Sequence, residues 1–209
     1  MPSGGAWSVV AAALLVAACS HPVPLEPVSG QPPLVRRTDA RVGIVYAGGA
    51  GVVTIGRWGH YLEVGQASVA HFDQAFATMF SEVTPLPNSP AWRELGTPLD
   101  GVMEVQRTDA TLENGNNFGR REGARPDVVR IGYRICLFEP SGVEVRCWSP
   151  TATETRQRES KECERLELCW AALTQAAMRS AIARFLVDAQ SDPAMLAWAA
   201  RLRSGGTRP

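Results

Sequence analysis

The chain has 209 residues, and its 21 acidic side chains balance its 21 basic ones, so the formal net charge is zero. Because a balanced chain lacks the basic excess typical of nucleic-acid binding, nucleic acid is not an expected partner. Lys161 is the only lysine, so lysine-based catalysis is not expected either.

A short apolar segment followed by a cysteine opens the chain. Residues 6–18 are uncharged and apolar, which is too short for the roughly 20 residues of a membrane-spanning helix but typical of the central part of a signal peptide. The sequence Leu15-Val16-Ala17-Ala18-Cys19 resembles the lipobox of bacterial lipoproteins. This resemblance implies that residues 1–18 are a signal peptide and that Cys19 carries the lipid.

Two observations qualify this interpretation. Residues 1–5 lack the positive charge that signal peptides normally carry, and Cys19 could instead close an ordinary buried apolar helix. If Cys19 is acylated, the next residue is Ser20, which in the enterobacterial pattern implies transfer to the outer membrane. The expected location is therefore the periplasmic face of the outer membrane, with the lipid as the membrane contact.

The composition changes after the cysteine. Prolines stand at positions 22, 24, 27, 32 and 33, so residues 19–40 predict an extended tether. One periplasmic domain over 41–203 then accounts for most of the chain, and residues 204–209 predict a disordered tail.

Strand-forming residues begin the predicted domain. Segments 42–47 and 52–55 predict two strands joined by a turn at 48–51, and 61–64 predicts a third. A glycine-rich turn that cradles phosphate should open a helix, whereas strand formers follow here, so no nucleotide or other cofactor is expected.

The glycines and aromatics around residues 56–61 form a candidate partner-binding loop. Its side chains are Arg57, Trp58, His60 and Tyr61, and aromatic and arginine side chains are frequent in protein interfaces. The alternative is that Trp58 and Tyr61 only cap the core beside a turn.

The middle of the chain alternates helix and strand signals. Residues 67–80 predict an amphipathic helix, because Val69, Phe72, Phe76, Met79 and Phe80 fall on one face. Strands are expected at 82–86 and 101–107, with an irregular segment at 88–100 that crosses the sheet edge. Residues 114–126 predict a long exposed loop.

The strongest strand signal is a β-hairpin over 128–138 and 143–148, with a type I turn at 139–142. If Glu139 pairs with Val143, the odd positions from Val129 to Cys147 form the apolar face, and Arg130, Arg134 and Arg146 point the other way. This register places Cys136 and Cys147 on opposite faces, unless a bulge changes it.

Two helices complete the chain. Residues 164–189 predict a long helix whose inner face includes Cys169, and 193–202 predict a short helix that docks through Met195, Leu196 and Trp198. The predicted hairpin face makes Cys147 and Cys169 plausible neighbours, whereas Cys163 lies at or before the helix start.

Four cysteines remain besides Cys19, and an even number in an exported chain predicts disulfides. They are Cys136, Cys147, Cys163 and Cys169. Three pairings are possible, and buried free thiols are the alternative. No metal site is expected, since the cysteines and the three histidines lack the spacing of common metal ligands.

Together these elements predict an α+β fold. It is a single two-layer domain with a mostly antiparallel sheet, and the helices at about 67–80 and 164–189 pack on one face. The element pattern over 67–86, 133–148 and 171–185 resembles the α/β sandwich of small periplasmic lipoproteins, including the LPS-assembly lipoprotein and the N-terminal-like domains of TolB and curli-secretion lipoproteins. This resemblance implies no catalytic residues.

The expected function is therefore that of a non-enzymatic envelope adaptor that binds a protein or glycan through the exposed sheet face or its loops. An accessory lipoprotein of a lipid transporter is one alternative. An envelope hydrolase is another, although the sequence has no GxSxG or HExxH motif.

Overall fold

The structure is a computed structural model, and it describes residues 21–23, 25, 35–48, 54–57, 60–87, 98–113, 126–156 and 166–204. For residues 21–23, 54–57, 60, 61 and 166 the description is limited to the backbone. Three residues of the predicted sites, Cys19, Trp58 and Cys163, lie outside the described ranges.

The main sheet is mixed, with a parallel half and an antiparallel half. Its strands are β2 (Thr38–Ala47), β5 (Phe80–Pro85), β6 (Gly101–Glu113), β7 (Asp127–Phe138), β8 (Glu144–Trp148) and β9 (Thr151–Arg156). The order is β5-β2-β6-β7-β8, and β9 pairs with the other half of β7. Strand β2 runs parallel to β5 and β6, whereas β7 runs antiparallel to β6, β8 and β9.

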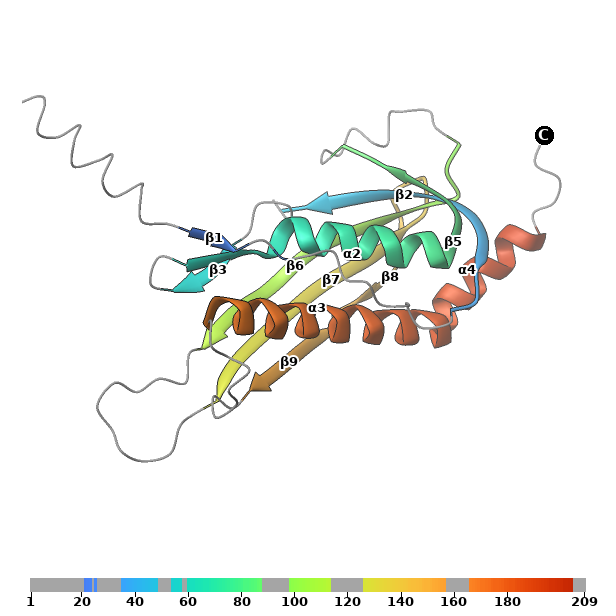
Figure 1. The fold of residues 1–209 in the computed structure, drawn as a ribbon. Helices are drawn as coiled ribbons and strands as arrows, with labels where there is room; N and C mark the ends of the chain where they lie inside the picture. The colour runs from blue at the N-terminus through green and yellow to red at the C-terminus, as the bar shows by residue number, and fades with distance from the viewer. Residues whose placement is uncertain are drawn as a thin grey trace, which may run out of the picture.

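Helices α2 (Val64–Met79) and α3 (Leu166–Ser191) cover one face of this sheet, as Figure 1 shows. Between the two layers, Phe185 of α3 makes edge contacts with Phe76 of α2 and Trp148 of β8, at centroid distances of 6.0 and 5.6 Å. Such aromatic contacts add to the apolar burial that holds the layers together. The predicted two-layer α+β fold with both helices on one face is confirmed.

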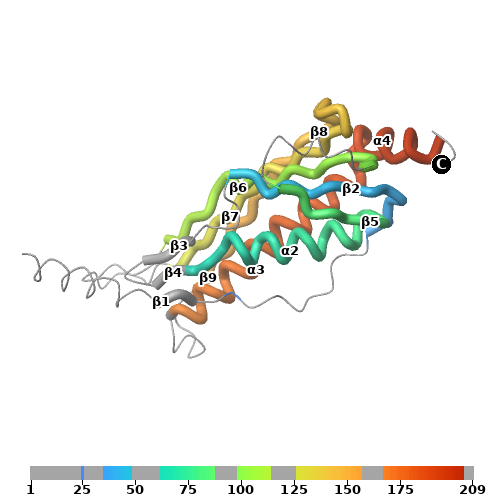
Figure 2. The backbone as a smooth tube through the Cα atoms, turned by 90° about the horizontal axis from the view of Figure 1, so that it is seen from above, coloured from blue at the N-terminus to red at the C-terminus, as the bar shows by residue number. Residues whose placement is uncertain are grey.

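A second, smaller sheet lies at one end of the molecule. It has the order β1-β4-β3, formed by β1 (His21–Val23), β4 (His60–Glu63) and β3 (Thr54–Arg57). The last helix, α4 (Pro193–Ser204), lies at the opposite end of the molecule (Figure 2). The long axis of the molecule therefore runs from the small sheet to α4.

The described residues of the predicted tether belong to this body. Strand β1 pairs with β4, and the partly buried side chains of Leu25 and Val35 pack against the core. These apolar contacts and strand hydrogen bonds hold the described residues against the domain. The described residues of the predicted tether thus contact the domain, and the extended tether over 19–40 stays a prediction.

Several element boundaries differ from the predicted ones. Helix α2 begins at Val64, because β4 ends at Glu63 and no loop separates them, and β5 follows at once from Phe80. The predicted helix stripe is otherwise correct, with Phe72, Phe76 and Met79 buried. Strand β9 was not predicted, since its alternation of threonine with Ala152, Glu154 and Arg156 is mostly polar.

The described ends of the connection from β5 to β6 contact the sheet face that the helices leave open. A Cβ atom on Gly43 of β2 would overlap with Leu86 and lie 2.9 Å from Leu99 Cδ1. Both leucines pack with Val45, Val102 and Phe138 in a small cluster apart from the main core. Gly43 therefore allows the crossover to lie close to β2.

Candidate functional site

A groove lies where the start of β2 meets the end of α3 and one side of α4. Its position depends first on the break between the two helices. Pro193 has no backbone N–H and cannot continue α3, so it opens a new helix at the position where proline is favoured. Asp192 caps that helix, because its Oδ1 accepts the Ala194 N–H at 2.8 Å.

Asp192 also ties α4 to the sheet. The Nε of Arg146 on β8 donates to Asp192 Oδ2 at 2.8 Å, and the side chain of Asp192 is only 9% exposed. Burial raises the pKa of Asp192, but the hydrogen bond from the Ala194 N–H and the nearby Arg146 guanidinium outweigh burial, and the net pKa is lowered. Arg146 therefore points toward the helix layer, and the prediction that it faces away is wrong.

Two further contacts fix the body of α4. Trp198 is 2% exposed and stands edge-on against Phe80 at a centroid distance of 6.3 Å. One turn further along the helix, Arg201 donates to Glu139 Oε1 at 2.9 Å. These contacts leave Leu196, which is 49% exposed, directed away from the core.

The opposite wall of the groove is the chain that leads into β2. The side-chain amide of Gln190 pairs with the backbone of Arg36 in both directions, since its Oε1 accepts the Arg36 N–H and its Nε2 donates to the Arg36 carbonyl, each at 2.9 Å. Arg37 donates from Nε to the Phe80 carbonyl at 3.0 Å and from one terminal nitrogen to the Ser81 carbonyl at 3.1 Å. The backbone of this wall and one of its guanidinium groups are thus held in place.

The resulting arginine groove has a volume of about 300 Å³. Its lining combines basic with apolar side chains. Its lining residues are Arg36, Arg37, Thr38, Asp39, Gln190, Met195, Leu196, Ala199 and Arg203. A volume of this size is at the lower end of the range for ligand pockets, roughly 300–1,000 Å³.

The charges of the arginine groove are not balanced within it. Among the described residues, the guanidinium groups of Arg36, Arg37 and Arg203 form no ion pair with an acidic side chain, and Asp39 is the one acid in the lining. Guanidinium groups present several N–H donors that match carboxylate or phosphate oxygens. The groove can therefore bind an anionic group that carries an apolar part.

A second cavity of about 280 Å³ lies on the other side of α4, beside Trp198. Here the single arginine, Arg201, is already paired with the single glutamate, Glu139. Among the described residues, this cavity therefore has no unpaired arginine for an anion, whereas the arginine groove has three.

Two polar side chains that helix α2 places in or near the core have hydrogen-bond partners within the fold. Ser68 of α2 and Tyr133 of β7 share a hydrogen bond of 2.7 Å, and burial raises the pKa of Tyr133 to about 12. His71 Nδ1 lies 2.7 Å from the Ala67 carbonyl, and burial lowers the pKa of His71. Both side chains stay uncharged at neutral pH and stabilise the packing of α2.

The predicted partner-binding loop is described only in part. Strands β3 and β4 form an antiparallel hairpin in which Arg57 pairs with His60 and Gly56 pairs with Tyr61. The structure thus brings Arg57 and His60 together at the backbone level. Trp58 lies outside the described residues, so the role of this loop stays a prediction.

The cysteines differ from the expected arrangement. The predicted turn is correct, since Glu139 donates its N–H to the Val143 carbonyl at 2.8 Å and Gly142 has a φ of 86°. However, the register shifts between Leu137 and Phe138, which brings Cys136 directly opposite Cys147. The two form a disulfide, so the predictions that they face opposite sides and that Cys147 neighbours Cys169 are wrong.

Cys169 is also disulfide-bonded, with a partner outside the described residues. Val143, which was also predicted on the apolar face, is 60% exposed. Free thiols are therefore excluded for the three described cysteines.

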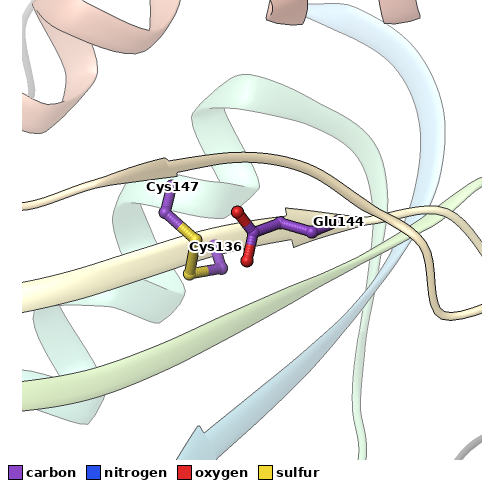
Figure 3. A group of neighbouring side chains, drawn as sticks. All are labelled: Cys136, Glu144 and Cys147. Atoms are coloured by element: carbon purple, nitrogen blue, oxygen red, sulfur yellow. A yellow bond between two sulfur atoms is a disulfide. The ribbon is translucent and has the colours of Figure 1, made fainter.

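The carboxylate of Glu144 points toward the Cys136–Cys147 disulfide, as Figure 3 shows. Possible ligand atoms of the three residues lie within 4.8 Å of one another. Because both sulfurs are bonded to each other, neither is the thiolate that binds a metal. The group is therefore part of the sheet surface, where Arg134 lies 3.8 Å from Glu144 and 3.6 Å from the Cys147 sulfur.

Sequence reasoning missed the arginine groove. Its walls come from residues 36–39 and from the end of the chain, and nothing in the spacing of these segments indicates that they meet. The available signals were the basic pair Arg36-Arg37 and the arginines at the end of α4.

Comparisons with known proteins show similarity in fold. No protein-family model and no curated protein sequence matches the chain. The structure is similar to that of a protein from Helicobacter pylori described as a neuraminyllactose-binding hemagglutinin homolog, with a TM-score of 0.52 and 7% identity over 88% of this chain and 100% of that one. This likeness shows a shared fold.

Two weaker likenesses are to a protein of family DUF330 from Xanthomonas campestris and to a lipoprotein from Neisseria meningitidis. The first has a TM-score of 0.49 and 10% identity, covering 90% of this chain and 100% of that one. The second has a TM-score of 0.37 and 13% identity, covering 66% and 98%. Several other similar structures are also described as bacterial lipoproteins. No helix in the described ranges is long and apolar enough to cross a membrane.

Proposed function

We propose that this chain is a lipid-anchored protein of the bacterial cell envelope that acts as a non-enzymatic adaptor, anchored at one end and binding its partner at the other. The observation that carries the proposal is the position of β1. This strand begins only two residues after Cys19 in the sequence and lies at the end of the molecule opposite α4, which lines the arginine groove (Figure 1). The lipid and the groove would thus serve separate ends of one body.

The register of the small sheet defines the anchored end. Strand β1 is parallel to β4 with His21 opposite His60, so the beginning of β1 lies beside the turn that joins β3 to β4. Two Cα steps place Cys19 within roughly 8 Å of His21. An acylated Cys19 would therefore hold this turn close to the lipid headgroups.

This geometry gives the predicted partner-binding loop a second interpretation. Arg57 ends β3 and His60 begins β4, so both lie at the turn, and Trp58 follows Arg57 in the sequence. Arginine attracts anionic headgroups, and tryptophan favours the membrane–water boundary. We expect this loop to rest on the membrane.

The groove would then be presented away from the anchoring membrane. Helix α3 has 26 residues and is thus roughly 39 Å long. It runs along the sheet from the end with the small sheet to α4 (Figure 1). A partner that reaches α4 would meet the arginine groove well beyond the headgroup layer.

Acylation is tested by growing cells with an alkyne-bearing fatty acid and detecting its attachment to the purified chain. We expect labelling of the wild type and of the matched control Ser20→Ala, and none of Cys19→Ala. Equal labelling of Cys19→Ala, or no labelling of the wild type, would refute the anchor.

The orientation is tested separately on the acylated chain in vesicles. A fluorescent amino acid is introduced at position 57 or, in a second variant, at position 203, and nitroxide-bearing lipids serve as quenchers. We expect strong quenching at position 57 and little at position 203. Similar quenching at both positions would contradict the proposed orientation.

A further inference from the structure

We infer that the arginine groove binds an acidic segment with apolar side chains from a partner protein. The inference rests on the proposed function for one step, the choice of a protein segment over lipid headgroups. The other steps depend only on charges and contacts within the groove.

The first step is charge. Arg36, Arg37 and Arg203 line one groove, and no acidic side chain of the described residues forms an ion pair with them. Three like charges around a cavity repel one another, and an anion relieves this repulsion. Asp39 adds one negative charge to the lining, so the net charge of the groove stays positive.

The second step is preorganisation. Arg37 uses two of its N–H groups on the carbonyls of Phe80 and Ser81, which fixes its guanidinium group and leaves the remaining donors for a ligand. Gln190 fixes the Arg36 backbone in the same wall. Because these groups are already ordered, a carboxylate would lose less affinity to the ordering of side chains.

The third step is the apolar floor. Met195, Leu196 and Ala199, together called the apolar floor, line the groove with the arginines, and Leu196 is 49% exposed. An inorganic anion would leave this floor uncovered, whereas a segment that alternates acidic and aliphatic residues would cover it. The groove thus fits a mixed acidic and apolar segment better than a free phosphate.

The fourth step decides between a protein segment and a lipid as the ligand of the groove. An anionic lipid headgroup with its acyl chains also combines charge and apolar surface. The groove, however, is lined by α4, which lies at the end of the molecule opposite β1 (Figure 1), and it is hence far from the proposed anchor at Cys19. The headgroups of the anchoring membrane would therefore not reach it.

The test uses the full mature chain in detergent and a fluorescein-labelled peptide, Asp-Leu-Glu-Ser-Asp-Leu-Glu, with anisotropy as the readout. We expect saturable binding that weakens as salt rises. Arg203→Gln and Arg36→Gln should each weaken it roughly tenfold, as expected for loss of a charge-assisted contact. The matched control is Arg179→Gln, which removes one exposed positive charge from α3 outside the groove and should leave affinity unchanged.

The apolar floor is tested with Leu196→Ser and a second peptide in which serine replaces leucine. Leu196→Ser should weaken binding of the leucine-containing peptide and leave the serine peptide unaffected. Circular dichroism of each variant shows that α4 is still folded. Equal affinity of the wild type for both peptides would contradict the role of the floor.

Three outcomes would overturn the inference. They are the absence of saturable peptide binding, equal weakening by Arg179→Gln and Arg203→Gln, and displacement of the peptide by phosphatidylglycerol vesicles through a contact that Arg203→Gln abolishes. The last would assign the groove to a lipid surface. Because the peptide assay does not need the anchor, its result is independent of the fatty-acid labelling that tests the proposed function.

Discussion

The open face of the sheet and the arginine groove both carry arginines, but only those of the sheet face have acidic partners. On the open face, Arg130 lies 3.0 Å from Asp109 and Arg134 lies 3.8 Å from Glu144. In the groove, the guanidinium groups of Arg36 and Arg203 form no such pair among the described residues. The comparison indicates that Arg130 and Arg134 are paired within the fold, whereas the arginines of the groove are available to a ligand.

The physical reason is how each region is built. On a sheet, neighbouring strands place opposite charges at fixed cross-strand positions, and such pairs stabilise the pairing itself. The groove instead joins the start of β2 to the end of the chain across a distance of 154 residues, as in the contact of Arg36 with Gln190. No regular pairing forces an acid to stand opposite each of its arginines.

The largest effect is expected from a substitution that disrupts the groove without changing its charge. Trp198→Ala removes the side chain that anchors α4 in the core and should cost about 3–5 kcal/mol of unfolding free energy. Peptide binding should be lost as well, because α4 forms one wall of the groove. Urea unfolding monitored by far-ultraviolet circular dichroism, a signal that does not depend on tryptophan fluorescence, measures the first effect. The control is Leu196→Ala, at an exposed position of the same helix. A loss below about 1 kcal/mol would show that α4 is not docked through this residue.

The second effect is expected from removing the disulfide between β7 and β8. Replacing both Cys136 and Cys147 by alanine opens a disulfide with a sequence separation of 11, and the loss of cross-linking should cost about 2–3 kcal/mol. Peptide binding should stay within twofold of the wild type, since the disulfide lies away from the groove. A parallel loss of binding at temperatures where the variant is folded would show that the two regions are coupled.

A smaller effect is expected at the helix cap that supports the groove. Asp192→Ala removes the cap of α4 and should cost about 1 kcal/mol at pH 7, whereas Asp192→Asn keeps a cap without the charge. The folded pKa of Asp192 is below its ordinary value of 3.8. Its stabilising effect is therefore present above that value and is lost as the pH falls through the folded pKa.

This pH dependence is checked by urea titrations of the wild type and both variants between pH 7 and pH 2. The difference between the wild type and Asp192→Asn should shrink below about pH 4. A difference that stays constant over this range would contradict the charged cap.

The smallest effects are expected from two substitutions that compare an arginine of the sheet with an arginine of the groove. Arg130→Gln breaks an exposed ion pair on the sheet and should cost at most about 0.5 kcal/mol, because water and salt screen such pairs. Arg203→Gln should cost nothing measurable or slightly stabilise the chain, since it relieves repulsion within the groove. Thermal melts at low and high salt compare the two variants. A larger loss for Arg203→Gln would mean that this arginine has a structural partner.

Hydrophobic periodicity was sufficient to predict the helices of the inner layer and the central strands of the sheet, although not β9. Phe72 and Phe76 at helical spacing predicted α2, and the alternation of Ile131, Tyr133 and Ile135 predicted the inner face of β7. These patterns follow from local geometry, because a helix repeats about every 3.6 residues and a strand every two. The turn at Gly142 was predictable for the same reason, since glycine tolerates the positive φ that the turn requires.

Other features depended on pairing between elements. One register shift between Leu137 and Phe138 reversed the predicted faces of Cys147 and decided its disulfide. The packing of Leu25 and the pairing of β1 with β4 placed on the domain a segment whose prolines predicted a tether. The arginine groove likewise required the ends of the described chain to meet.

The sequence by itself determined the two-layer fold class and supplied the lipobox-like Cys19, because both are written in short stretches of neighbouring residues. Only the tertiary structure decided that Cys136 bonds with Cys147, that β1 pairs with β4, and that Arg36, Arg37 and Arg203 share one groove. Contacts between remote segments depend on register and packing over the whole domain, and no local pattern encodes them.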